Sequence, residues 1–495
     1  MDRYLAHSSG MVLWVLMFPL LVFFALADDF SESELTARLG WLLLLVAISY
    51  VIKSKWLFLL LLWPFALSGV VDLFYTSTFN QQFEASLVRV LTDTDSAETL
   101  EFLDVYISLI NVSLLVAYLL GFVYLGRKLQ LFTPEGYKSK LVIAFGLIML
   151  VVAVQQVAFH ERYKDVLPGA FGQLTDGIHK YIALQDEMTM RPMLLQNYSG
   201  VVGKEAEKAP QTYVVVIGES AVRGHHGLYG YHRDTNPALT VLKNELILFD
   251  DVISPFAVTY LALSHALTQK SLVNNIPFAE ALSLVELAKK GGFQTWWISN
   301  QPRYEGTTLS LSQVSDHALY LTDNGKTDSY LLPTIKQAIA SPQTHKVIFV
   351  HLRGSHMSYA KRYPEEFDHF KSAELAIYTK TPSEAQVSVV NAYDNSIRYT
   401  DFILNEIVNM LKTQEQSVNG LVYFSDHGEE VYDYKNFIGH ELKRVSPEMF
   451  EIPFIVWTNQ NYQQVFDYKM QNMHKFRSEP FLNDSFLSLV YVLWD

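Results

Sequence analysis

The stretch YVVVIGES (residues 213–220) decides the fold class of the larger part of this chain. A continuous β-branched run that ends in glycine is typical of a strand buried on both faces of a parallel sheet. Glu219 and Ser220 follow this run directly, so the strand delivers a carboxylate and a hydroxyl to its own carboxyl end. Open α/β sheets place their active sites at this edge. The stretch therefore predicts both a central strand and the position of a site.

Further apolar runs of the same form follow along the chain, at residues 295–300, 346–352, 420–428 and 451–457. Helix-like stretches lie between them, among them residues 278–291 and 383–413. Buried strands that alternate with helices predict an α/β sandwich around a largely parallel sheet. We expect this domain to span residues 211–495.

The first third of the chain has a different composition. The 495 residues are 50% hydrophobic with a mean hydropathy of +0.12, and the excess lies before residue 160. Apolar runs at 11–27, 39–52, 56–71, 107–125 and 141–159 each approach the roughly 20 residues that cross about 30 Å of hydrocarbon. The second run is short, and we expect Arg38 to extend toward the bilayer surface beside it. Residues 1–159 are thus predicted to form a five-helix transmembrane bundle.

The charges between these runs predict the orientation of the chain in a membrane. Acidic and basic loops alternate, and basic loops face the cytoplasm, so everything after about residue 160 is expected outside. Residues 160–210 are predicted to be an interfacial helical linker, either at the bilayer surface or packed on the following domain. The net charge of −13 argues against a nucleic-acid partner. The absence of cysteine excludes disulfides and thiolate metal ligands.

Three clusters of polar residues carry candidate chemistry. The first is Glu219 with its neighbours, and the second is ISPFAVTYLALSHALT (253–268), in which Thr259 opens a helix-like run. A hydroxyl at a helix N-terminus lies in a positive potential that stabilises anions. The third cluster is Asp426-His427 within SDHGEE (425–430), followed by His440. We expect the three clusters to meet at the sheet edge.

Carboxylates and an imidazole without a thiol suit zinc, or less well manganese. The metal would lower the pKa of the Thr259 hydroxyl and polarise a phosphoryl oxygen. His356 and His440 are candidates to bind phosphate oxygens or to protonate a leaving group. Each residue also has a plain structural explanation: Glu219 as a helix cap, Thr259 as an N-cap, and Asp426-His427 as a loop hydrogen bond. Ser254 is a rival candidate for the nucleophilic hydroxyl. Their combination in one α/β pattern favours the metal site.

Together these residues resemble the membrane phosphoethanolamine transferases of the alkaline phosphatase/sulfatase superfamily. The resemblance rests on GESAVRGHHGLYGYHRDTNP (218–237), Thr259, HLRGSHMSYAKRYP (351–364), SDHGEE (425–430) and GHELKRVSPEMFEIPFIVW (439–457). It implies a five-helix anchor in a bacterial inner membrane, with a monomeric chain whose catalytic domain lies in the periplasm.

The resemblance also implies residue roles. One or two zinc ions would be bound by residues matching Glu219, Thr259, Asp426 and His427. Thr259 would be the nucleophile and form a phosphoethanolamine–threonine intermediate with phosphatidylethanolamine as donor. His356 and His440 would contact the phosphate group.

Two departures from the family pattern leave the acceptor open, between lipopolysaccharide core or lipid A and periplasmic glucan. Family members that modify lipid A usually contain disulfides, and they carry a lysine where this chain has QPRYEG (301–306) after Asn300. We expect Arg303 to supply that positive charge and Asn300 to contact substrate. Glu98, in LTDTDSAETLEFL (91–103), either helps to hold the lipid head group or lies on a solvated helix face.

Three alternatives remain at this point. A phosphoglycerol transferase of the lipoteichoic acid synthase type would share the anchor and the threonine, but the segments LYGYHRDTNP and RGSHMSYAKRYP fit it less well. A plain phosphatase or sulfatase would have no need of a bilayer donor. A non-catalytic membrane scaffold would have no need of Glu219, Thr259, Asp426 and His427.

Overall fold

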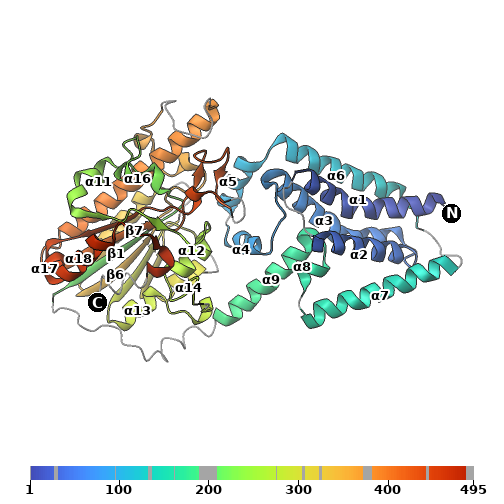
Figure 1. Ribbon diagram of the computed structural model, residues 1–495, viewed down its shortest axis with the longest axis horizontal. Helices are drawn as coiled ribbons and strands as arrows, with labels where there is room; N and C mark the ends of the chain where they lie inside the picture. Colours follow the sequence, from blue (N-terminus) through green and yellow to red (C-terminus); the bar gives the residue numbers. More distant parts are fainter. Residues whose placement is uncertain are drawn as a thin grey trace. The chain divides into compact units, whose positions relative to one another are not determined.

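A computed structural model gives the structure of the chain, which divides into two compact units, Met1–Asp186 and Glu187–Asp495. Each unit is described by itself below, and Figure 1 labels its helices and strands. The structure describes residues 2–26, 32–94, 96–131, 137–160, 162–188, 209–274, 276–303, 307–322, 326–371, 382–441 and 445–486.

The N-terminal unit is helical, and each of the predicted apolar runs falls mainly within one of its long helices. Among the residues that the structure describes, three helices are long and apolar enough to cross a membrane: Lys55–Phe79, Leu109–Lys128 and Lys140–His160. A count of five crossings stays a prediction. The helices of this unit are α1 (Asp2–Leu26), α2 (Glu32–Ser49), α3 (Lys55–Phe79), α4 (Ser86–Asp93), α5 (Ser96–Tyr106), α6 (Leu109–Lys128), α7 (Tyr137–His160), α8 (Tyr163–Val166) and α9 (Gly169–Met188).

A buried ion cluster in this unit corrects the expectation for Arg38. Arg38 is 4% exposed, forms an ion pair with Glu34, and places Nη2 2.7 Å from Asp72 Oδ2. The same carboxylates accept backbone N–H groups at the start of α9, from Gly169 to Glu34 (2.8 Å) and from Ala170 to Asp72 (2.8 Å). Arg38 therefore does not extend to the bilayer surface, because Glu34 and Asp72 hold it inside the helical unit, and the positive α9 N-terminus stabilises these two carboxylates.

The C-terminal unit is built on a seven-stranded sheet of order β2-β10-β7-β1-β6-β4-β5. The pairs β1–β6, β1–β7, β4–β6 and β4–β5 are parallel, as predicted, whereas β10 is antiparallel to both of its neighbours. The strands are β1 (Gln211–Gly218), β2 (Leu246–Leu248), β4 (Gln294–Ser299), β5 (His317–Tyr320), β6 (His345–His351), β7 (Val418–Ser425) and β10 (Phe454–Thr458). The continuous apolar runs thus form central strands buried on both faces.

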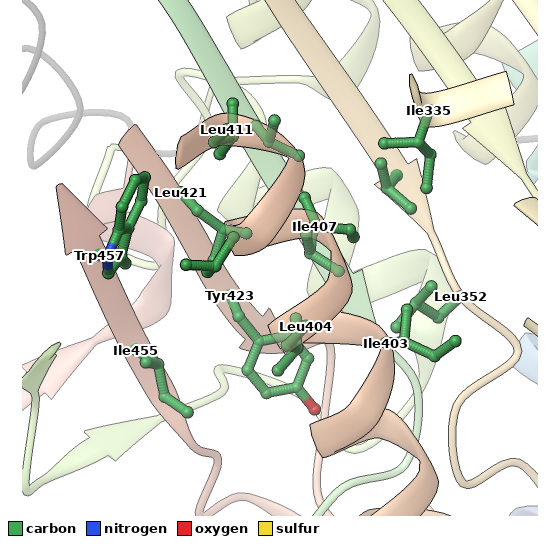
Figure 2. Packing of buried hydrophobic residues seen from close by; sticks show 14 of the residues in the cluster. Ile335, Leu352, Ile403, Leu404, Ile407, Leu411, Leu421, Tyr423, Ile455 and Trp457 are labelled. Atoms are coloured by element: carbon green, nitrogen blue, oxygen red, sulfur yellow. The ribbon is translucent and has the colours of Figure 1, made fainter. Parts of the chain in front are cut away.

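Helices cover both faces of the sheet, as Figure 1 shows. On one face lie α11 (Pro237–Val241), α15 (Leu332–Ile339) and the long α16 (Glu384–Lys412). On the other lie α12 (Thr259–Ala266), α13 (Leu284–Lys290) and α14 (Thr307–Ser312). In Figure 2, side chains of α16 pack against the strands, with Leu404 and Ile407 facing Tyr423 and Leu421 of β7. This packing fixes the strand ends that carry the polar residues.

Candidate metal centre and active site

The carboxyl ends of β1 and β7 bring three candidate metal ligands together. The two strands are parallel neighbours, and Gly218 of β1 pairs with Ser425 of β7. Glu219 directly follows Gly218, and Asp426 and His427 directly follow Ser425. Their exposed fractions are 2%, 0% and 0%, so the three side chains form a buried polar cluster at the sheet edge.

The turn after β1 is held in a strained conformation. Ser220 has a φ of +55°, which costs a non-glycine residue about 1–3 kcal/mol. Its backbone N–H donates to Asp426 Oδ1 (3.2 Å), and its hydroxyl donates to Glu219 Oε1 (3.2 Å). Gly354 comes so close that a Cβ there would lie 2.8 Å from the Glu219 nitrogen, so its φ of +53° and the contact both require glycine. Glu219 therefore has a fixed backbone.

Thr259 faces this cluster from the first position of α12. The N-cap is Val258, so the Thr259 side chain does not cap the helix. Its Oγ1 lies 3.2 and 3.4 Å from the two Glu219 oxygens and 3.5 Å from His427 Nε2. The hydroxyl predicted to be the nucleophile thus lies against the candidate metal ligands, at the positive end of a helix.

Ser254, the rival hydroxyl, has a different environment. It is 1% exposed, and its Oγ lies 2.6 Å from the carbonyl oxygen of Asp426 and 2.8 Å from that of Phe256. Both contacts are with acceptors, so the hydroxyl fastens its own turn to the loop that carries Asp426. The geometry favours Thr259 over Ser254 as the reacting hydroxyl.

The donor atoms of the cluster fit a divalent metal. His427 Nε2 lies 3.3 Å from Glu219 Oε1 and 3.4 Å from Asp426 Oδ2, and ligand atoms of the three residues lie within 4.8 Å of one another. His427 Nδ1 donates to the Gly428 carbonyl (2.8 Å), which leaves Nε2, directed at the carboxylates, as the ring atom that could bind a metal. Asp426 Oδ2 is buried and accepts no hydrogen bond from the residues that the structure describes. Two carboxylates, one imidazole and a nearby hydroxyl suit tetrahedral zinc.

The protonation equilibria of these residues are tightly linked. Burial raises the pKa of Asp426, and the Glu219 carboxylate raises it further, to about 8. Burial lowers the pKa of His427, but the charges of Asp426 and Glu219 outweigh burial and raise this pKa to about 10. Burial also raises the pKa of Glu219, but its hydrogen bond to His427 prevails and holds the pKa below its ordinary value. The cluster therefore attracts positive charge, which a divalent cation supplies.

His440 lies beside this cluster and is oriented by a carboxylate. Its ring centroid is 4.1 Å from that of His427. Its Nδ1 donates to Glu429 Oε2 (2.7 Å), while the Tyr359 hydroxyl donates to Glu429 Oε1 (2.7 Å). His427, Glu429 and His440 also form a second group whose ligand atoms lie within 4.8 Å of one another. This arrangement directs His440 Nε2 away from Glu429.

Two further histidines come from β6 and the turn after it. Burial lowers the pKa of His356 well below its ordinary value, although Glu219 opposes the shift. Burial likewise lowers the pKa of His351 to about 4. Burial thus favours the neutral form of both rings, and a neutral ring can bind a phosphoryl group through one N–H.

The other predicted substrate residues, Asn300, Arg303 and Glu98, are not brought to the metal cluster by the contacts that the structure describes. Asn300 Nδ2 donates to Asp328 Oδ1 (2.8 Å), and the Arg303 guanidinium lies over the Tyr320 ring, 5.7 Å from its centroid. Glu98 lies in α5, and its side chain is outside the part of the chain that the structure describes. Roles for these three residues in substrate binding stay predictions.

Two contacting residues were missing from the predicted set. Gln301 donates to Glu219 Oε2 (3.3 Å), and Glu429 bonds His440 as described above. Glu429 lies two positions after His427 in SDHGEE, and Gln301 directly follows Asn300. Both residues lie beside predicted site residues in the sequence. The sequence does not indicate, however, that their side chains point toward the metal cluster.

The loop after Ser220 is organised by a buried charge network centred on His225. Its Nδ1 lies 2.5 Å from Asp394 Oδ1, and its Nε2 lies 3.0 Å from Asp433 Oδ2. Arg233 completes the network with Nη1 2.7 Å from Asp394 Oδ2. Tyr229 secures the same loop, because its hydroxyl donates to the Phe454 carbonyl (2.8 Å). These contacts therefore fasten the histidine-rich loop to α16 and β10.

His225 is expected to make the stability of the protein depend on pH. Burial lowers the pKa of His225, but Asp394 and Asp433 outweigh burial and raise it to about 10. A raised pKa stabilises the fold fully below the unfolded value of about 6.5, and this contribution is lost as pH rises toward 10. The melting temperature of the full chain in detergent should thus fall between pH 7 and pH 9.5.

Replacing His225 with glutamine should lower the free energy of unfolding at pH 7 by about 3–5 kcal/mol, because the buried aspartates lose a partner. The same change should also reduce the fall between the two pH values. The matched control is His232→Gln, which alters an exposed histidine of the same loop. Equal melting temperatures for the two variants would contradict the network.

Comparison with known proteins first identifies the class of the C-terminal unit. Residues 211–492 match the Sulfatase family model. The periplasmic domain of EptC from Escherichia coli, solved as a complex with Zn, aligns with a TM-score of 0.53 at 28% identity, over 58% of this chain and 83% of that one. The integral membrane lipooligosaccharide phosphoethanolamine transferase A of Neisseria meningitidis aligns over 99% of this chain and 95% of its own, with a TM-score of 0.69 at 19% identity. The second likeness extends the shared fold to the helical unit.

The sequence comparison then identifies the family. Phosphoethanolamine transferase EptC of Escherichia coli O18:K1:H7 (strain RS218 / NMEC) is 30% identical over 460 residues, which cover 84% of this chain and 78% of the relative. The chain belongs to the phosphoethanolamine transferases, enzymes that carry a sulfatase-type α/β domain.

Proposed function

We propose that this protein transfers phosphoethanolamine from phosphatidylethanolamine to a lipopolysaccharide core, lipid A or periplasmic glucan acceptor, through a covalent intermediate on Thr259. The single observation that carries the proposal is the position of Thr259 Oγ1, which lies 3.2 Å from Glu219 Oε1 and 3.5 Å from His427 Nε2. A hydroxyl among metal ligands and at a helix N-terminus has the environment of an activated nucleophile.

Zinc is the proposed cofactor, bound by Glu219, Asp426, His427 and Thr259. When bound, it would lower the pKa of the Thr259 hydroxyl and stabilise charge on the phosphoryl oxygens. One or two ions are proposed, since His427, Glu429 and His440 form a second group of possible ligand atoms beside the first. The zinc-bound EptC domain supports the choice of metal.

The reaction proceeds in two displacements at phosphorus. Thr259 Oγ passes its proton to His440 Nε2 and forms a bond to the phosphorus of the donor. The bond from phosphorus to the diacylglycerol oxygen breaks, and His440 gives this proton to the leaving oxygen. An acceptor hydroxyl then passes its proton to His440 as its oxygen bonds to the same phosphorus, the bond to Thr259 breaks, and Thr259 Oγ takes up that proton.

The proposed location is a bacterial inner membrane, with residues 1–159 as a five-helix anchor, residues 160–210 as a linker and residues 211–495 as a periplasmic catalytic domain. Three helices of sufficient length and hydropathy support the anchor. A donor that resides in the bilayer explains why the catalytic domain is tethered to it. Asn300, Arg303, His356 and Glu98 remain the proposed contacts to substrate, and the chain is proposed to act as a monomer.

Transfer is tested with the purified full chain in detergent micelles. Phosphatidylethanolamine labelled in its diacylglycerol part should release labelled diacylglycerol, and a zinc chelator should abolish this release until zinc is restored. A parallel reaction with labelled phosphatidylglycerol tests the phosphoglycerol alternative. Release from phosphatidylglycerol alone would replace the proposed donor, and no release from either lipid would favour a scaffold. Mass spectrometry of envelope glycolipids and glucans from cells with and without the protein identifies the acceptor.

Glu429 is expected to control the orientation of the His440 ring. Glu429→Gln removes the charge that fixes the His440 Nδ1–H, so turnover should fall about 10–100-fold while zinc content stays unchanged. Tyr359→Phe is the matched control, because it removes only the hydroxyl that donates to the other Glu429 oxygen, and it should have a smaller effect. Loss of one zinc equivalent in Glu429→Gln would instead assign Glu429 to a second metal site.

A further inference from the structure

Gln301 contacts the metal cluster from the end of β4. Its Nε2 lies 3.3 Å from Glu219 Oε2 and 3.0 Å from the carbonyl oxygen of Leu352. The side-chain amide has two hydrogens, so both acceptors can be bonded at the same time. Gln301 is 6% exposed, and this buried amide therefore joins the candidate ligand to the backbone after β6.

The backbone of Gln301 is itself fixed to the sheet edge. Its N–H donates to Ser299 Oγ (3.0 Å), and the Ser299 hydroxyl donates back to the Gln301 carbonyl (3.2 Å). Ser299 is the last residue of β4 and is fully buried. The preceding N–H, of Asn300, donates to the His351 carbonyl (2.9 Å). The amide of Gln301 is thus presented from a rigid strand end rather than from a mobile loop.

The Glu219 carboxylate needs such a partner because its last torsion angle has a broad energy minimum. Its Oε1 lies near His427 Nε2 (3.3 Å) and the Ser220 hydroxyl (3.2 Å). The bond from Gln301 to Oε2 fixes the plane of the carboxylate. A neutral amide does this without adding a positive charge that would repel a cation.

We propose that Gln301 is a positioning residue that holds the Glu219 carboxylate in the orientation that binds the divalent metal. This inference rests on the proposed zinc site. It adds a residue whose own atoms need not touch substrate or metal. Loss of such an outer partner typically weakens metal binding about 10–100-fold.

The test is a zinc titration of the metal-free full chain in detergent, in competition with a chromophoric chelator. Gln301→Leu should raise the zinc dissociation constant about 10–100-fold. The matched control is Gln294→Leu at the other end of the same strand, where the side chain accepts the Trp296 indole N–H (3.2 Å) and lies away from the candidate metal ligands. The control should bind zinc with wild-type affinity.

A second measurement separates positioning from a purely structural role. The melting temperature of each metal-free variant reports on the fold, and Gln301→Asn keeps the amide but shortens its reach. If Gln301→Leu does not fold, Gln301→Asn should still bind zinc more weakly than the wild type. A dissociation constant within twofold of wild type in the folded variant would overturn the inference and leave the proposed function intact. Failure of the wild type to bind zinc would overturn the proposed metal site itself.

Discussion

Replacing Thr259 with alanine is expected to lower phosphoethanolamine transfer by about a thousandfold or more. Loss of a covalent nucleophile removes the low-barrier route entirely, and comparable substitutions in other enzymes have effects of this size or greater. The fold should survive, because Thr259 Oγ1 contacts Glu219, His427 and Asp426 of the candidate metal cluster and alanine favours a helix. Release of labelled diacylglycerol measures the effect.

The controls for this substitution test the choice of hydroxyl. Thr259→Ser keeps an oxygen at the same position and should retain measurable transfer. Ser254→Ala and Ser220→Ala remove the two neighbouring hydroxyls and should retain a covalent intermediate. Near-wild-type transfer by Thr259→Ala would show that Thr259 is not the nucleophile and would return Ser254 and Ser220 to consideration.

The second large effect is expected at Asp426. Asp426→Asn keeps the Oδ1 that accepts the N–H groups of Ser220 (3.2 Å) and His427 (2.7 Å), but it removes the negative charge from the buried Oδ2 position. Zinc affinity should fall by more than about 100-fold, since even outer partners of a metal ligand account for 10–100-fold. Transfer at limiting zinc should fall in parallel. Zinc content after dialysis and activity against zinc concentration measure both effects.

The matched control for this change is Asp328→Asn, which alters another buried carboxylate near the sheet edge. Asp328 accepts the N–H groups of Arg353 (2.9 Å) and Gly354 (3.0 Å), and it is not in either candidate metal group. It should therefore affect folding stability more than zinc affinity. Wild-type zinc affinity in folded Asp426→Asn would remove Asp426 from the metal site.

Most of the sheet could be predicted because its central strands are continuous apolar runs. The run at 213–217 became β1, and the runs before Asn300, after Lys346 and before Asp426 became its near neighbours β4, β6 and β7. The direction of β10 was not predictable, because a run buried on both faces has the same composition in either direction. β2 has three residues and β5 has four, too few for a periodic signal.

Part of the candidate site could likewise be predicted from the sequence, and part could not. Glu219, Thr259, Asp426 and His427 could be placed together because each follows a strand or opens a helix. Partners from distant parts of the chain could not be predicted: Arg38 with Asp72, and His225 with Asp394 and Asp433, are paired only by the packing of separate elements. Asn300 and Gln301 are adjacent, yet the first bonds Asp328 and the second bonds Glu219, because neighbouring residues at a strand end point in opposite directions.

The most direct test of the account is to locate the covalent intermediate by peptide mass spectrometry. The full chain is incubated with labelled phosphatidylethanolamine without acceptor, quenched in acid and digested. We expect the mass of one phosphoethanolamine group on Thr259 and its loss on addition of acceptor. A labelled Ser254, Ser220 or any other residue, or transfer without a labelled peptide, would contradict it.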